Sequence, residues 1–74
     1  MMEIKEWMKN DMVMKLASLL IEDHKAVDVP SALATVMNSE TYERLIDEQT
    51  GLYYQSPRYV YDYLKNELLL GKMS

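Results

Sequence analysis

The sequence has no cysteine and a single histidine, His24, among its 74 residues. A disulfide is therefore excluded, and the three or four thiolate or imidazole ligands of a zinc site are missing. The chain also lacks a glycine-rich phosphate loop, a Gly-x-Ser-x-Gly elbow and a His-Glu-x-x-His motif, which mark many nucleotide-binding and hydrolytic enzymes. These absences predict a protein that is not an enzyme, with no catalytic residues, no metal ligands and no cofactor.

Long hydrophobic runs are missing too. The apolar stretch Leu19–Ile21 is far shorter than the roughly 20 residues of a membrane-spanning helix. The first twelve residues alternate charged and apolar positions, unlike the core of a signal peptide. We therefore expect a cytoplasmic protein of bacterial type that has no membrane partner.

Basic charge is scarce and scattered. Eight lysines and arginines stand against twelve acidic residues, so the formal net charge is -4. The bases are spread from Lys5 to Lys72 without forming a run. Because such a chain repels a phosphate backbone, nucleic acid is not a favoured partner.

Glycine and proline occur only twice each, while 49% of the residues are hydrophobic. This composition argues against disorder and for a packed helical domain. We expect residues 1–74 to form a single domain, at a size where burial of a core barely exceeds the entropy cost of folding. With disulfides and metals excluded, self-association is the remaining common source of added stability.

The clearest helical pattern covers residues 12–21, which contain neither glycine nor proline. Its polar positions form one stripe at i, i+4, i+7 and i+11 spacing, namely Asp11, Lys15, Ser18 and Glu22. Nearly all of the remaining circumference is apolar. We predict an all-α fold, a small bundle of four to five helices around a central apolar helix at 11–24, which other elements or a second copy would cover.

Short-range signals position the remaining helices at 30–37, 40–47 and 57–70. Ser39 and Ser56 are helix-capping residues, and Pro57 suits the first helical position. Gly51 suits a turn with positive φ, followed by an extended or looped stretch at 52–54, and Gly71 suits the end of the last helix. Helical periodicity assigns these residues to the core: Met12, Val29, Ala32, Leu33, Val36, Met37, Tyr42, Leu45, Ile46, Val60, Leu64 and Leu68.

The segment before the central helix has a different apolar face. Ile4, Trp7 and Met8 lie at i, i+3 and i+4, yet the same helical wheel places them on the side where the polar stripe points outward. Two alternatives remain open. Either the chain breaks near residues 9–11, where Asn10 or Asp11 would cap a new helix, or the first turns project and present Trp7 to a partner.

Five of the six tyrosines fall at positions 53–63. A tyrosine ring with a wet hydroxyl suits the rim of a core, the centre of an interface or a base-stacking platform. The core rim is the commonest setting, and Asp62 and Glu67 would interrupt the positive groove that base stacking requires. We select as partner-binding residues Ile4, Trp7, Met8, Tyr54 and Tyr61.

The ionisable residues have simpler interpretations. His24 falls in the last predicted turn of the central helix, where the helix dipole favours histidine, and no nucleophile motif accompanies it. The acidic pairs at 22–23 and 47–48 lack the alternating ligands around a glycine that calcium loops use. We therefore expect all of them to be structural or solvated.

A DNA-binding regulator is the alternative function. The helix pair at 30–47 resembles a helix-turn-helix, whose second helix would enter the groove. That helix offers one arginine, Arg44, against the three acids Glu40, Glu43 and Asp47, which disfavours contact with phosphate. Salt-dependent duplex binding that weakens on Arg44→Ala would favour this alternative.

The C-terminal half resembles a group of short uncharacterised bacterial helical proteins. The shared pattern is a Tyr and a Leu on a short helix, a Thr-Gly-Leu-Tyr turn and a helix opened by Ser-Pro. The matching positions are Tyr42, Leu45, Asp47, Thr50, Gly51, Leu52, Tyr53, Ser56, Pro57, Tyr59 and Val60. Some of these similar proteins are associated with toxin–antitoxin pairs, so the resemblance implies a protein-partner role.

Taken with the composition, these patterns predict a non-enzymatic protein–protein interaction module. Its partner would be a second copy of the chain, giving a homo-oligomer such as a dimer, or a small protein that it binds as an antitoxin does.

Overall fold

The computed structural model describes residues 3–71, which form helices and no strand. The four α-helices are α1 (Ile4–Glu22), α2 (Val29–Met37), α3 (Glu40–Ile46) and α4 (Pro57–Leu70), and two single 3₁₀ turns, η1 (Glu48–Thr50) and η2 (Leu52–Tyr54), join α3 to α4. The prediction of an all-α fold is confirmed. Residues 52–54 are helical rather than extended, which corrects that local prediction.

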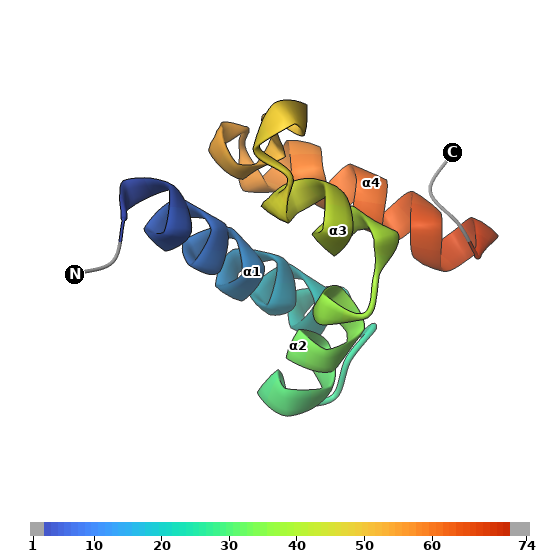
Figure 1. Ribbon diagram of the computed structural model, residues 1–74. Coiled ribbons are helices and arrows are strands. Elements are labelled where there is room, and N and C mark those ends of the chain that lie inside the picture. The colour runs from blue at the N-terminus through green and yellow to red at the C-terminus, as the bar shows by residue number, and fades with distance from the viewer. Residues whose placement is uncertain (1–2, 72–74) are drawn as a thin grey trace.

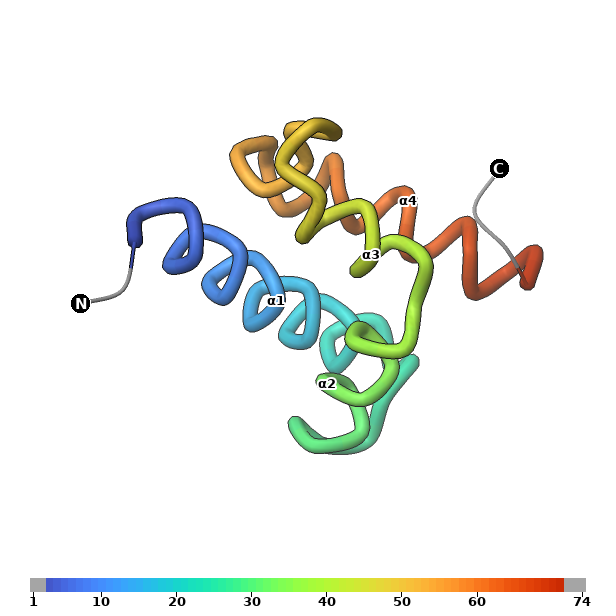
Figure 2. Tube along the Cα trace, in the orientation of Figure 1, coloured from blue at the N-terminus to red at the C-terminus, as the bar shows by residue number. Residues whose placement is uncertain are grey.

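The long helix α1 contacts all three other α-helices and η2. Figure 1 shows α2 folded back beside the C-terminal half of α1, with α3 and α4 on another side of the bundle. In the trace of Figure 2, the C-terminal end of α4 extends past α3, on the side of the molecule away from the start of α1. Among the described helices, none is long and apolar enough to cross a membrane.

Every α-helix contributes to one hydrophobic core. Its completely buried aliphatic side chains are Leu16, Leu20, Ala32, Val36, Leu45, Val60 and Leu64. Met12 is 4% exposed, as predicted, whereas four residues assigned to the core are between 42% and 54% exposed and lie outside it, namely Val29, Met37, Ile46 and Leu68. The predicted helices are present, but the elements packed against each helix cover only part of its apolar face. The remaining apolar side chains of that face are left exposed.

Helix α1 is continuous through residues 9–11, so the predicted chain break is wrong. Met12, Val13, Leu16, Ala17 and Leu20 are buried along one side. Lys9 is also buried on this side and forms ion pairs, as described below. The other alternative, a projecting first segment, agrees with the exposure of Ile4 and Trp7, but ion pairs of Lys5 and Lys9 join this segment to η1.

The connection after α1 reverses the chain through a left-handed residue. His24 has φ of 58°, and its N–H donates to Ile21 while the N–H of Lys25 donates to Leu20, 3.0 and 2.9 Å away. This pair of bonds is the Schellman arrangement, in which glycine is usual at the left-handed position. His24 therefore has a backbone role at this turn.

The predicted caps are present. The hydroxyls of Ser39 and Ser56 accept hydrogen bonds from the N–H groups of Tyr42 and Tyr59 at the starts of α3 and α4. Gly71 ends α4 with φ of 80°. These features depend on residues three or four positions apart, which is why local spacing located them.

A second cap on α3 comes from α4. The carboxylate of Glu67 accepts hydrogen bonds from the N–H groups of Glu40 and Thr41 at 2.8 and 2.9 Å and from the Thr41 hydroxyl at 2.8 Å. A carboxylate at a helix N-terminus satisfies free N–H groups and interacts favourably with the helix dipole. Glu67 therefore holds α3 against α4.

Candidate partner-binding surface

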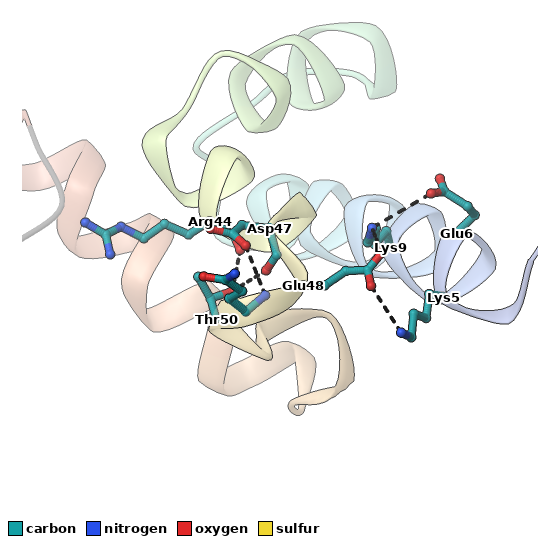
Figure 3. Close-up of polar contacts among 8 residues, drawn as sticks. Lys5, Glu6, Lys9, Arg44, Asp47, Glu48 and Thr50 are labelled. Carbon is teal, nitrogen blue, oxygen red and sulfur yellow. Dashed lines mark hydrogen bonds and ion pairs between the residues drawn. The ribbon is translucent and has the colours of Figure 1, made fainter.

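An ion-pair cluster ties the beginning of α1 to η1. Lys5 and Lys9 lie one turn apart on α1 and converge on the carboxylate of Glu48, at 3.1 and 3.2 Å (Figure 3). A weaker contact of 3.8 Å joins Lys9 to Glu6. The hydrogen bond from Lys5, followed by that from Lys9, lowers the pKa of Glu48, and Glu48 in turn raises the pKa of Lys5.

Lys9 links this cluster to the neighbouring aromatic turn. The residue is only 7% exposed, and its ammonium lies 5.9 Å from the centre of the Tyr53 ring. Tyr53 and Tyr54 contact each other edge to face, with ring centres 5.3 Å apart. A cation near an aromatic face is attracted to it, so Lys9 helps to hold η2 beside α1.

Gly51 allows the chain to make this turn. Its φ is 69°, and a Cβ atom there would lie 2.7 Å from the hydroxyl oxygen of Tyr54. A side chain at position 51 would meet both backbone strain and a clash. The Thr50 hydroxyl supports the turn by donating to the carbonyl oxygens of Arg44 and Asp47.

A hollow of about 180 Å³ lies between α1 and η2, which we call the Trp7 hollow. Its apolar lining comes from Trp7, Met8, Met12, Tyr53, Tyr54 and Pro57. The polar residues at its edge are Asp11 and Lys15, which pair with each other at 2.8 Å, and Gln55. The fold thus gathers three of the five predicted partner-binding residues, Trp7, Met8 and Tyr54, around one concavity.

The rim of this hollow carries large exposed apolar groups. Trp7 is 59% and Tyr54 is 61% exposed, while Met8 is half-buried between them. Ile4, at 75% exposure, precedes Trp7 by one turn but does not line the hollow. We refer to Ile4, Trp7, Met8 and Tyr54 as the Trp7 surface.

Tyr61 is the exception among the predicted partner residues. It is 1% exposed, and its hydroxyl donates a hydrogen bond to the Asp23 carboxylate at 2.6 Å. Burial, together with this bond, raises the pKa of Tyr61. The selection of Tyr61 as a partner-binding residue is therefore corrected: α4 turns this ring toward α1, and the residue is part of the core.

A second hollow, of about 310 Å³, continues along α1 from the Trp7 hollow. The two share Lys15 and Pro57, and the second extends to Leu19, Glu22 and Arg58. From Trp7 to Glu22 the helix rises about 22 Å, at about 1.5 Å per residue. The predicted polar stripe of α1 thus forms one wall of an elongated groove.

Sequence reasoning missed the role of Lys9 and Glu48. They lie 39 positions apart, and each resembles an ordinary surface charge in the sequence. The position of Lys9 on the interior-facing side of the helix could have indicated this role, because a buried lysine needs a charged partner.

The acidic residues do not gather as ligands. Within residues 3–71, no group of three or more acidic or histidine side chains is placed to hold a metal ion. Asp23 accepts the Tyr61 hydrogen bond, Asp47 accepts from the N–H of Gln49, and Glu48 pairs with lysines. On α3 and at its C-terminal end, the exposed residues Glu40, Glu43, Arg44 and Asp47 surround a polar depression.

Comparison of the chain with protein-family models, with curated proteins and with solved structures finds no match.

Proposed function

We propose that this protein is a non-enzymatic interaction module that binds another protein chain through the Trp7 surface. The observation that carries the proposal is the exposed indole of Trp7 beside exposed Tyr54, at the rim of an apolar hollow. Tryptophan and tyrosine are enriched among residues that dominate binding energy. The ion pairs of Lys5 and Lys9 with Glu48 tie α1 to η1, the turn that leads into the η2 wall of the hollow, before a partner arrives.

The size of the hollow favours a side chain over a small molecule. Ligand sites usually enclose about 300–1,000 Å³, and the Trp7 hollow measures about 180 Å³. An engineered apolar cavity of roughly 150 Å³ accommodates benzene. The Trp7 hollow thus fits one large apolar side chain, inserted as the anchor of a partner segment.

The groove along α1 suggests the form of that segment. A span of about 22 Å corresponds to about four turns of a helix, and helices that dock in grooves use anchors at i, i+3, i+4 and i+7 spacing. The resemblance of the C-terminal half to proteins of toxin–antitoxin pairs favours a small protein as the source. An antitoxin-like role is therefore part of this proposal.

The DNA-binding alternative has less support. Three acids surround Arg44 on the exposed face of α3, and a recognition helix of that charge would be repelled by phosphate. Duplex binding that weakens with salt and with Arg44→Ala would reverse this preference.

The test is affinity capture from the native host with the wild-type chain and two matched variants on α1. Trp7→Ala removes the indole, and Met14→Ala removes an apolar group that is 52% exposed but lies outside the hollow. We expect a partner recovered by wild type and Met14→Ala and lost with Trp7→Ala, with a shift of tryptophan emission to shorter wavelength on binding. Capture that is indifferent to Trp7→Ala would refute the proposed surface.

A further inference from the structure

The outward face of α4 has a second pattern that the Trp7 surface does not use. Tyr59, Tyr63, Asn66 and Leu70 follow one another at intervals of four, three and four residues. This is the spacing of the seam of a two-helix coiled coil. Tyr59 is 48% and Leu70 is 61% exposed, while the opposite side of α4 is buried in the core. We call these four residues the α4 seam.

The tyrosines of this seam are already ordered. Their rings contact edge to face with centres 5.3 Å apart, and their hydroxyl oxygens are 3.1 Å apart. Such a pair forms a stiff apolar ridge, and an ordered ridge loses little conformational entropy when it is covered.

We propose that the α4 seam packs antiparallel against the α4 seam of a second copy of the chain. With the two-fold axis level with residues 64 and 65, Tyr59 of one copy faces Leu70 of the other. Tyr63 then faces Asn66, so every seam position has a counterpart.

The charges beside the seam favour this orientation. Asp62 and Lys65 lie on the same flank of α4 with side chains 70% and 47% exposed, and their contact within one chain is long, at 3.9 Å. Antiparallel packing brings Asp62 of each copy near Lys65 of the other, on both sides of the axis. In a parallel pair, the two-fold axis would run along the helices and place this flank of the two copies on opposite sides of the seam, so Asp62 and Lys65 of one copy would not meet those of the other. Leu69, 79% exposed on this flank, would gain cover from the second copy.

The interface is small. From Tyr59 to Leu70 the seam is about 16 Å long, at about 1.5 Å per residue. Stable interfaces bury roughly 1,200–2,000 Å² in total, and three turns of helix provide less. We therefore expect a reversible dimer that forms at high protein concentration. Because the Trp7 surface lies on α1 and η2, the dimer would present two copies of it, and this inference does not depend on the proposed function.

The first test is sedimentation equilibrium of the full chain from about 10 µM to 1 mM, a range that covers weak association. Wild type should fit a monomer–dimer equilibrium. Leu70→Glu, which places a charge opposite Tyr59 at both ends of the seam, should weaken dimerisation about tenfold or more, as loss of a strong interface contact does. The matched control is Val27→Glu, at a position 91% exposed and outside α4, which should leave the dissociation constant unchanged. Circular dichroism would verify the fold of each variant.

The second test reverses the flanking charges. Asp62→Lys should weaken the dimer severalfold, and the double variant Asp62→Lys with Lys65→Asp should restore it, because each reversed charge again meets its opposite in the other copy. A wild-type chain that stays monomeric at 1 mM, equal effects of Leu70→Glu and Val27→Glu, or no recovery in the double variant would each overturn the inference.

Trp7→Ala should leave the dimer intact. A dimer lost with Trp7→Ala but kept with Leu70→Glu would reject the α4 seam and leave the Trp7 surface standing.

Discussion

At the scale of single residues, His24 has an unusual backbone conformation. It is the one described non-glycine residue with positive φ, at 58°, and the left-handed conformation costs an L-residue roughly 1–2 kcal/mol. Its position after α1 is the one that glycine commonly occupies in this kind of helix terminus. The turn is therefore made at some expense of stability.

Replacing His24 by glycine should stabilise the protein. Relief of the left-handed strain exceeds the extra backbone entropy of glycine, so we expect a gain of about 0.5–1 kcal/mol. For a domain of this size, that corresponds to a rise in the thermal midpoint of roughly 3–6 °C. Calorimetry would measure it. Lys25→Gly adds the same flexibility at a residue without positive φ and should not stabilise; an equal gain in both variants would reject the explanation.

Glu48 makes the stability dependent on pH. Its folded-state pKa lies below the ordinary 4.5, because Lys5 and Lys9 donate hydrogen bonds to its ionised form. The folded protein therefore holds this proton less tightly than the unfolded chain. The stabilising contribution is complete above pH 4.5 and is lost as the pH falls from 4.5 through the lowered pKa.

Glu48→Gln should accordingly flatten this part of the profile. We expect the thermal midpoints of wild type and variant to differ most near neutral pH and to converge as the pH falls from 4.5 through the lowered pKa of Glu48. Added salt should reduce the difference at neutral pH, because exposed ion pairs are screened. Glu43→Gln, at an exposed acid of α3, is the control. A gap between wild type and Glu48→Gln that stays constant with pH would contradict the role of the ion pairs.

At the scale of elements, α3 is the helix that depends most on its neighbour. It has only seven residues, and isolated helices of that length are unstable in water. Its first turn is capped from within by Ser39 and from α4 by Glu67. The position of α3 is thus determined by a residue 26 or 27 positions away.

Glu67→Ala should loosen α3 selectively. Loss of three charge-assisted hydrogen bonds at a helix N-terminus is expected to cost about 1–2 kcal/mol of unfolding free energy. Urea denaturation would give the global loss, and amide exchange should accelerate first in residues 40–46. Glu43→Ala, on the exposed face of the same helix, should change stability by less than about 0.5 kcal/mol. Uniform acceleration across all helices would show that Glu67 does not act locally.

At the scale of the whole molecule, one chain provides its own core. The exposed surface is 4994 Å², close to the roughly 4,700 Å² that a folded monomer of this length usually exposes. Of the apolar positions of α1, Leu16, Ala17 and Leu20 are no more than 2% exposed in a single chain, whereas Met14 is 52% exposed. Association is therefore a property of the outer faces.

The thermal midpoint should consequently be independent of protein concentration in the low micromolar range. A shift below about 2 °C over a tenfold dilution is expected when folding does not require association. Differential scanning fluorimetry and calorimetry would cover the range. A midpoint that rises by many degrees with concentration would show that the monomer is not stable by itself, contrary to the completeness of its core.

The helical class could be predicted from the sequence alone, as could the caps at Ser39 and Ser56 and the turns at Gly51 and Gly71. The sequence also predicted that Ile4, Trp7 and Met8 lie on a different face from the other apolar residues of the helix. These properties arise from backbone conformation and side chains within about four positions of each other, where spacing alone defines the geometry.

Packing between helices determines which apolar positions are buried and which charged side chains form pairs. It buries Tyr61 against α1, leaves Met37 and Leu68 exposed, and joins Lys9 to Glu48. Burial depends on where neighbouring helices cross, and that crossing is set by packing among residues distant in the chain. For the same reason, the hollow beside Trp7 exists only once α1 and η2 lie together, and of its lining residues the sequence singled out Trp7, Met8 and Tyr54 for partner binding.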